Sequence, residues 1–270
     1  METELEETYT ITFSEAIVTH AGMKTIGHKL KKGFSVDDVK ISEEIFKKAG
    51  AKTELYDLLD LLSDSDIEDM DDFPTDLDAN ILVIRNGVDY LLDDGDTIDD
   101  FLKEQKSLTP DDKAKMRGKV VNKRARTNLC FSTFSQKSDV QNGIGTVIDF
   151  KDIHYTNCIR NNLPKFFTDK AANLNAELNK YYDIGKCSIG FHSDLERVIV
   201  IGVRVGNHNK SFPLFYQWYQ HHNKIGSMKQ IDLYSGDVYI MSHKATGNDG
   251  RRSLIPTLKH AAGMKKTLKL

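Results

Sequence analysis

The chain has 270 residues, of which 39% are hydrophobic, and its formal net charge is −3. This length suggests one large domain or two modest ones, with enough apolar side chains for a real core. No window approaches 18 consecutive apolar residues, and the acidic start METELEETYT has no apolar stretch behind it, so neither a membrane span nor a secretory signal is expected. Three widely spaced cysteines favour a reduced, intracellular protein of the cytoplasm or nucleus.

The charge is divided unevenly along the chain. Residues 1–104 hold 27 acidic and 10 basic residues, a net of −17, whereas residues 105–270 hold 13 acidic and 27 basic residues, a net of +14. This asymmetry indicates two modules with different partners. The basic half would suit a polyanion or an acidic co-substrate, although two halves that merely attract each other would have the same pattern.

The first half begins with patterns of one strand and one helix. TYTITFSEAI (8–17) alternates between apolar and polar residues as a strand does. SVDDVKISEEIFKKAG (35–50) is predicted to be a helix, since Ser35 is a good cap, acids come early, lysines come late and Gly50 is a stop signal.

An acidic loop and a hairpin are predicted next. Residues 54–78 start with helical leucine spacing and become very acidic, but they lack the glycine and the distal glutamate of an EF-hand calcium loop. A solvated acidic surface is the better interpretation. Residues 79–92 hold two apolar runs around Asn86-Gly87, the pair that favours a type I′ hairpin turn. We therefore expect residues 1–105 to form a small acidic α+β module of unknown role.

The second half is dominated by strand-like runs. LTPDD (108–112) has the pattern of a capped helix start, and residues 163–182 have helical character. Many short strands at close spacing predict a sandwich, a barrel or a jelly roll. The strand-like runs are GTVIDF (145–150), RVIVIGVRVG (197–206), SFPLFYQWY (211–219), KQIDLYSGDVYIMS (229–242) and SLIPTLKHAAG (253–263).

One histidine and one carboxylate lie two residues apart at the start of such a run. They are His192 and Asp194, and a further histidine, His260, lies in the last strand-like run. A His-x-Asp pair and a distant His that project from strands can hold one face of Fe(II) and leave three positions open. The pair alone is a weak signal, since it occurs by chance in many chains and is often only a polar pair at a turn.

The segments around this pair carry a resemblance. Asn179-Lys180-Tyr181 is followed by a glycine-containing turn and then by His192-Ser193-Asp194. The same order is found in the AlkB-like branch of the 2-oxoglutarate/Fe(II)-dependent dioxygenase superfamily, which the chain resembles over about residues 115–270. The similarity includes Glu196, an acid two residues past the aspartate, and the segments IGVRVG, LFYQW, SGDVYIMS and TLKHAAG.

The resemblance implies a fold, a chemistry and a set of ligands. It implies that residues 106–270 form a double-stranded β-helix, or jelly roll, in an α+β chain, and that the protein is an oxidoreductase using 2-oxoglutarate and O₂ for hydroxylation or demethylation. Fe(II) would be bound by the catalytic residues His192, Asp194 and His260, and Asn179 and Tyr181 would hydrogen-bond the 2-oxoglutarate. His243 is the alternative to His260, because it also follows the Gly-Asp strand.

One feature departs from the family pattern. The family places arginines that pair with the 2-oxoglutarate carboxylates after its distal histidine, because the planar guanidinium matches a carboxylate. Here only AAGMKKTLKL follows His260, and it contains no arginine. Lys269 is the candidate for the far carboxylate, with Arg251 or Arg252 as alternatives. The missing arginine also leaves open a degenerate oxygenase fold that only binds.

The substrate is less well indicated. The basic run RGKVVNKRARTNLCF (117–131) could contact phosphates, and Trp218 could stack on a base, although aromatic residues at strand spacing are more often in the core. The resemblance to AlkB-like oxygenases, whose members often oxidise N-methyl groups of nucleic acid bases, implies an oxygenase that acts on such bases. The alternatives are an oxygenase for a protein or a small molecule, and the binding module without turnover.

Overall fold

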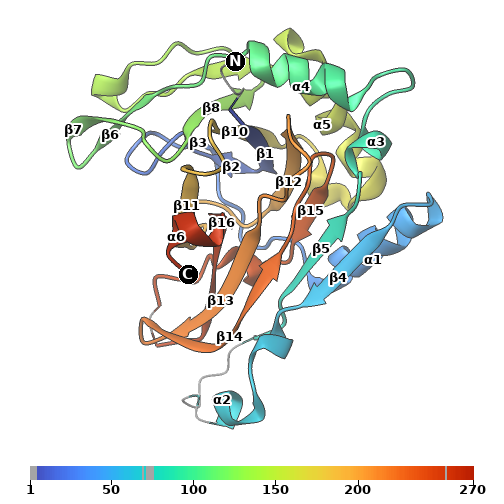
Figure 1. Cartoon of the computed structure of the whole chain (residues 1–270), viewed down its shortest axis with the longest axis vertical. Coiled ribbons are helices and arrows are strands. Elements are labelled where there is room, and N and C mark those ends of the chain that lie inside the picture. Colours follow the sequence, from blue (N-terminus) through green and yellow to red (C-terminus); the bar gives the residue numbers. More distant parts are fainter. Residues whose placement is uncertain (1–4, 69, 71–75, 253) are drawn as a thin grey trace.

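Two β-sheets make up most of the structure, a computed structural model that describes residues 5–68, 70, 76–252 and 254–270 (Figure 1). The mixed α+β class expected from the sequence is confirmed. The larger sheet contains, in spatial order, β4 (Thr53–Asp57), β5 (Asn80–Ile84), β15 (Val238–Met241), β12 (Val200–Gly206), β1 (Thr8–Ser14), β10 (Asn175–Tyr181), β8 (Thr127–Ser132) and β9 (Val147–Asp149). The smaller sheet contains β11 (Ser188–His192), β16 (Thr257–Gly263), β13 (Leu214–Gln220) and β14 (Asn223–Ile231).

Two short ribbons and several helices complete the described part of the chain. The ribbons pair β2 (Ala16–Ile17) with β3 (Ile26–Gly27), and β6 (Lys113–Met116) with β7 (Lys119–Asn122). The α-helices are α1 (Val36–Lys48), α2 (Asp64–Glu68), α3 (Val88–Leu91), α4 (Ile98–Ser107), α5 (His154–Phe166) and α6 (Lys265–Leu268). Among the described residues, no helix is long and apolar enough to cross a membrane.

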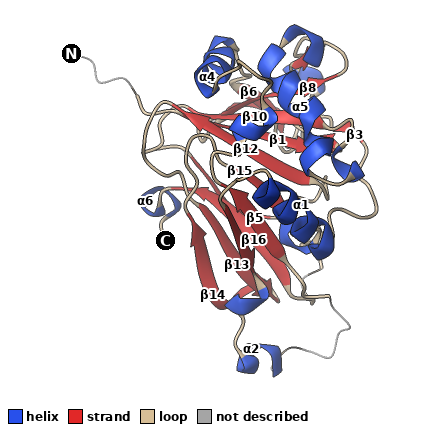
Figure 2. Ribbon diagram, turned by 90° about the vertical axis from the view of Figure 1, so that its right-hand side faces the viewer, coloured by secondary structure: helices blue, strands red, loops and turns tan. Residues whose placement is uncertain are grey.

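Helices cover one face of the larger sheet, and the smaller sheet packs near the other (Figure 2). One apolar cluster joins the larger sheet to α1, α3, α4 and α5, and a second joins it to the smaller sheet. Strand β12 shows both environments, because successive side chains of a strand point to opposite faces. Val203 and Val205 belong to the cluster under the helices, whereas Arg204 between them lines a pocket on the opposite face.

Strands from both halves of the chain share the larger sheet. The N-terminal strand β1 lies between β10 and β12, and β5 pairs with β15. The expected boundary at residue 105 therefore does not separate two sheets. Three strands of the larger sheet, β1, β4 and β5, come from the acidic half, and β1 lies between two strands of the basic half.

The helix predicted over residues 35–50 is confirmed as α1. The Ser35 hydroxyl accepts from the Asp38 amide, and the Asp38 carboxylate accepts from the Ser35 amide, so both ends of a capping box are present. The predicted strand over residues 8–17 is confirmed as β1 and β2. The predicted acidic loop is described only in part, because residues 69 and 71–75 lie outside the described residues.

The predicted hairpin at Asn86-Gly87 is wrong. A type I′ turn needs positive φ at both residues, but φ is 50° at Asn86 and −61° at Gly87. The chain continues as helix α3 instead of a second strand. The sheet explains this outcome, since β5 already pairs with β4 on one edge and with β15 on the other. No edge of β5 is left for a hairpin partner.

Two other local predictions fail for tertiary reasons. The helical segment expected over residues 163–182 is helical only to Phe166, and residues 175–181 form strand β10 between β1 and β8. The helix start expected at residues 108–112 is followed by strand β6. For residues 175–181, pairing with the distant strands β1 and β8 overrides local helix propensity, whereas β6 pairs with the neighbouring strand β7 in a hairpin. The strand-like runs of the second half are confirmed as β9 and β12 to β16, with residue 253 outside the described residues.

Candidate metal centre

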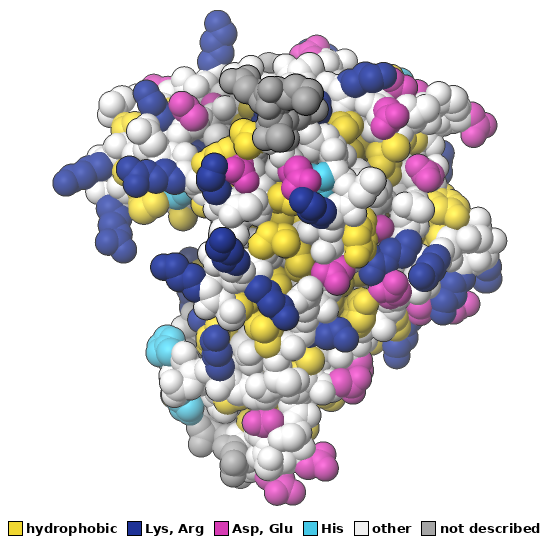
Figure 3. Space-filling view, in the orientation of Figure 1, with side chains coloured by type: hydrophobic (Ala, Val, Ile, Leu, Met, Phe, Trp, Pro, Cys, Tyr) yellow, Lys and Arg dark blue, Asp and Glu magenta, His cyan; other side chains and the backbone are white. Residues whose placement is uncertain are grey.

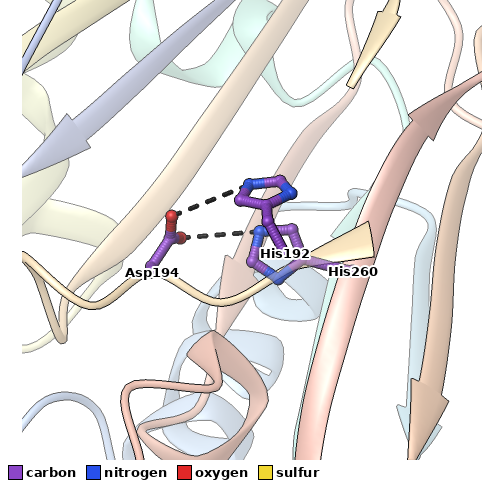
Figure 4. Close-up of side chains that lie close together, drawn as sticks. All are labelled: His192, Asp194 and His260. Carbon is purple, nitrogen blue, oxygen red and sulfur yellow. Dashed lines mark ion pairs between the residues drawn. The ribbon is translucent and has the colours of Figure 1, made fainter. Parts of the chain in front are cut away.

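His192, Asp194 and His260 come together at one end of the smaller sheet (Figure 4). His192 ends β11 and lies directly opposite His260 on β16, with ring centroids 4.4 Å apart. Asp194 follows in the next loop, where its amide donates to the Thr246 carbonyl at 3.0 Å. One potential ligand atom from each of the three residues lies within 4.8 Å of the others. The three side chains predicted as metal ligands are therefore neighbours.

The carboxylate of Asp194 lies to one side of the two neighbouring imidazoles and faces both of them (Figure 4). Asp194 Oδ2 is 3.6 Å from His260 Nε2, and Asp194 Oδ1 is 3.9 Å from His192 Nε2. His192 Nδ1 is 2.9 Å from the Gly190 carbonyl oxygen, which only accepts, so Nδ1 donates there and Nε2 is the nitrogen that faces Asp194. Burial lowers the pKa of His260 well below its usual value, and the charges of His192 and Arg197 add to this effect. A neutral imidazole is the form that binds metals.

His243 lies at a different place. Its Nδ1 accepts a hydrogen bond from the Gly33 amide at 2.8 Å, in the loop before α1. His243 does not line the pocket that His192, Asp194 and His260 share. Of His260 and His243, the two candidates for the third metal ligand, His260 is the one that lies beside His192 and Asp194.

The three residues open into a pocket of about 420 Å³ between the two sheets. Polar side chains form a row at matching register positions of four neighbouring strands, and three of them, Arg204, Thr10 and Asn179, line one wall of this pocket. Thr10 on β1 pairs with Arg204 on β12 and with Asn179 on β10, and Asn179 pairs with Asn128 on β8. Side chains directly opposite each other on paired strands lie on the same face of a sheet. We call Arg204, Thr10, Asn179 and Asn128 the polar row.

Arg204 is the most unusual member of the polar row. It is 1% exposed, and its Nε and Nη1 have no hydrogen-bond partner among the described residues. The hydroxyl of Thr10 also lacks a partner there. Arg204 packs on Phe212 and Tyr181, at 4.9 and 6.0 Å from their ring centroids, and burial lowers its pKa. A buried guanidinium without a carboxylate is costly, so this position favours an anionic ligand.

Asn179 and Tyr181 line the same pocket, as the sequence predicts. Asn179 Oδ1 accepts from Arg126 Nε at 2.5 Å and from the amide of Asn128, and Asn179 Nδ2 donates to Glu177 at 3.2 Å. Tyr181 is 3% exposed, and burial raises its pKa. Both side chains belong to β10, which is separated from Arg204 on β12 by strand β1.

The cation predicted for the co-substrate lies elsewhere. Lys269 follows α6, is exposed, and does not line the pocket. Arg251 and Arg252 are exposed as well and also lie outside the pocket lining. Sequence reasoning missed Arg204, although a single arginine inside the apolar run IGVRVG was a visible signal, because charged residues are rarely buried without a partner.

Comparison with known proteins adds a relative of the whole chain. No family model matches the sequence. An uncharacterized protein of Acanthamoeba polyphaga mimivirus is 42% identical over 267 residues, which cover 99% of this chain and 100% of the viral protein. The chain belongs to the family of that viral protein. Since the match spans both chains, the family's common length includes the region of β1 as well as the region of β16.

The basic segment after residue 112 forms a hairpin beside the pocket. Strands β6 and β7 pack on the loop that carries the pocket residues His20 and Ala21, where the Lys115 amide contacts Met23 Sδ at 3.1 Å. Lysine and arginine side chains project from this region of the surface (Figure 3). Lys113, Arg117, Lys119 and Arg124 are exposed, but Lys123 is buried.

Trp218 belongs to the core. It is fully buried in the cluster between the sheets, and its indole donates to the Leu58 carbonyl at 2.7 Å. It therefore cannot stack on a base, and the core interpretation of this aromatic segment is confirmed.

A second group of metal-binding residue types lies far from the pocket lining. Asp93, Asp96 and Cys158 approach one another near the first turn of α5. Asp93 accepts from Asn162 at 3.0 Å, and Cys158 donates to the Leu91 carbonyl at 3.6 Å. Carboxylates are stabilised near helix N-termini without a metal, so this group is explained by the helix.

Proposed function

We propose that this protein is a 2-oxoglutarate- and Fe(II)-dependent dioxygenase. The observation that carries the proposal is the pocket, which brings two histidines and a carboxylate together with a buried arginine whose Nε and Nη1 have no hydrogen-bond partner among the described residues. The triad offers a divalent metal the two imidazoles and one carboxylate that suit a non-haem Fe(II) site with open positions. Arg204 is a buried cation of the pocket lining, and it can pair with a carboxylate of a bound ligand.

The strand order supports the double-stranded β-helix. From β10 onward, the chain alternates between the sheets as it does in an eight-stranded jelly roll, giving β11, β16, β13 and β14 in one sheet and β10, β12 and β15 in the other. The remaining eighth place, between β10 and β12, would normally belong to a strand after β16. Here the N-terminal strand β1 occupies it.

The same substitution supports a relocated carboxylate site. In AlkB-like oxygenases, the strand after the distal histidine carries the arginines. In this chain β1 occupies the place of that strand, and its Thr10 lines the pocket. Arg204 lies next to it on β12. We infer that Arg204 and Thr10 bind the far carboxylate of 2-oxoglutarate and that Tyr181 and Asn179 lie along its flank. With a buried cation in the pocket, the reason for expecting a degenerate module weakens.

The residues of the chain would have distinct tasks in this reaction. Bound Fe(II) would supply the activation of O₂, with 2-oxoglutarate as the source of electrons, for oxidation of a substrate C–H bond. His192, Asp194 and His260 would hold the metal and leave the pocket side open. Arg204 and Thr10 would fix the direction of the co-substrate. The surrounding apolar cluster would keep bulk water away from the site.

For the substrate, we propose a nucleic acid. Lys113, Arg117, Lys119 and Arg124 are exposed on or after the hairpin that packs against the pocket loop, and residues 113–126 contain no acidic residue. Such a cluster suits phosphates rather than a neutral small molecule. Since Trp218 is buried, recognition of a base would depend on other pocket residues, among them His20.

Binding of 2-oxoglutarate tests the proposal. Calorimetry with the full chain, Mn²⁺ in place of Fe(II), and 2-oxoglutarate should give saturable binding that is much weaker without the metal. The His192→Ala variant should lose this metal dependence. Absence of 2-oxoglutarate binding in the metal-loaded protein would refute the proposed co-substrate.

A further inference from the structure

A buried chain of polar contacts leads from the metal ligand Asp194 to the polar row. Arg197 Nε lies 3.9 Å from Asp194 Oδ1. Arg197 Nη2 donates to Glu177 Oε2 at 2.7 Å, and both of these side chains are 6% exposed. Glu177 Oε1 accepts from Asn179 Nδ2 at 3.2 Å. Three contacts therefore join Asp194, beside the metal position, to Asn179 in the polar row.

Arg197 is the central charge of this series of contacts. Arg197 also donates to Glu196 Oε1 at 2.7 Å, so three carboxylates surround one guanidinium. Burial alone would lower the pKa of Arg197, but the carboxylates of Glu177, Asp194 and Glu196 outweigh burial and raise it. A buried ion pair of this kind often adds no net stability over an apolar pair of the same volume. What it does provide is a fixed direction for each group.

We infer that Arg197 and Glu177 are positioning residues that couple metal binding at Asp194 to co-substrate binding at Asn179. The inference rests on the proposed function and adds two residues of the pocket lining that are not among the proposed metal or carboxylate ligands. Arg197 restrains the carboxylate of Asp194, and Glu177 restrains the amide of Asn179. A shift at one end is passed to the other through the Glu177–Arg197 pair. Coupling between two sites is reciprocal, so each ligand should raise the affinity for the other.

Two variants separate this role from a structural one. Removing Arg197 alone would leave the Glu177 carboxylate buried and unpaired, so the double variant Glu177→Gln with Arg197→Met removes both charges together. Arg197→Lys keeps the charge but loses the fork that reaches two groups at once. Arg160→Lys is the matched control, since Arg160 is partly buried against Phe150 and donates to the Leu174 carbonyl away from the pocket.

The measurement is the affinity for Mn²⁺, determined calorimetrically with and without saturating 2-oxoglutarate. The ratio of the two dissociation constants is the coupling factor. Contacts behind a metal ligand typically change affinity by about 10- to 100-fold, so we expect the factor to fall about tenfold in both variants and to stay at the wild-type value in Arg160→Lys. If the double variant does not fold, Arg197→Lys decides.

Two results would overturn the inference. A folded variant with reduced melting temperature and an unchanged coupling factor would show that the pair is only structural. An equal fall of the coupling factor in Arg160→Lys would show that the loss does not depend on the Glu177–Arg197 pair. Failure of the proposed function looks different, because the wild-type protein would then bind no 2-oxoglutarate in the presence of metal.

Discussion

Thr10 and Arg204 face each other across β1 and β12, and neither the Thr10 hydroxyl nor Arg204 Nε and Nη1 has a hydrogen-bond partner among the described residues. They come from opposite ends of the sequence and meet because the N-terminal strand lies beside β12. Unsatisfied donors at two adjacent buried positions cost free energy unless a ligand accepts from them. The pairing thus links the unusual strand order to the proposed carboxylate site.

Replacing Arg204 tests that site. Arg204→Met keeps the buried volume and removes the charge, so the metal-loaded protein should need more than about tenfold more 2-oxoglutarate for half-saturation, because a buried charge-assisted pair is lost. Binding of Mn²⁺ alone should change little. Lys269→Ala is the control, since Lys269 is exposed and outside the pocket lining, and it should leave the 2-oxoglutarate requirement unchanged. A higher requirement only in Lys269→Ala would restore the expectation drawn from the sequence.

Loss of a metal ligand should remove metal binding without unfolding the protein. His192→Ala and Asp194→Ala each delete one of three potential donors at the pocket, so Mn²⁺ binding in calorimetry should become too weak to measure. Circular dichroism should be unchanged, because His192 is partly exposed at the end of β11. His243→Ala is the matched histidine control and should bind Mn²⁺ normally. Normal binding by the His192 variant would place the metal elsewhere.

The ion pairs around Arg85 should make stability depend on pH in the acid range. Arg85 Nε and Nη2 donate to both carboxylate oxygens of Glu54 at 3.0 and 2.6 Å, and these hydrogen bonds lower the pKa of Glu54 to about 2. A depressed carboxyl pKa contributes stability above the unfolded-state value of 4.5, and that contribution is lost as the pH falls toward 2.

Glu54→Gln should therefore flatten this part of the stability curve. Urea titrations between pH 5 and 2.5 should give a free energy of unfolding that falls about 1–2 kcal/mol less in the variant than in the wild type, after allowance for solvent screening. Glu44→Gln, an exposed change on α1, should leave the curve unaltered. An identical acid dependence in wild type and Glu54→Gln would mean that the pair with Arg85 contributes little.

The basic hairpin predicts salt-dependent binding of nucleic acid. The double variant Arg117→Gln with Lys119→Gln removes two exposed cations, so the slope of log K against log salt for an oligonucleotide should become shallower by about 1.5–2. The double variant Lys40→Gln with Lys48→Gln on α1 is the charge-matched control and should keep the wild-type slope. Equal slopes in all three proteins would argue against contact between the hairpin and phosphates.

Local signals in the sequence predicted the three metal-binding candidates but not the wall opposite them. His192 and Asp194 are close in sequence, and His260 was separated from His243 by resemblance, so the triad needed little knowledge of packing. Arg204 needed the pairing of β12 with β1, which no local pattern contains. The sequence predicted Lys269 as the cation that binds 2-oxoglutarate, because AlkB-like oxygenases place this cation on a strand after the distal histidine.

The errors in secondary structure have the same origin. Asn86-Gly87 is a favourable hairpin pair by itself, yet the neighbours of β5 leave no edge for a hairpin. Residues 175–181 have helix-forming residues such as Ala176, Glu177 and Leu178, yet they are buried between two strands. Where tertiary pairing was not needed, as in the capping box at Ser35, the sequence was sufficient.

Turnover of 2-oxoglutarate is the most direct test of the central proposal. Purified protein is loaded with Fe(II) without oxygen, then given O₂ and 2-oxoglutarate, with and without a methylated oligonucleotide, and succinate is quantified against His192→Ala and Arg204→Met. The account predicts succinate that requires Fe(II) and 2-oxoglutarate in the wild type and falls to background in both variants. Succinate no higher in the wild type than in His192→Ala, from protein that folds and binds metal, would contradict it.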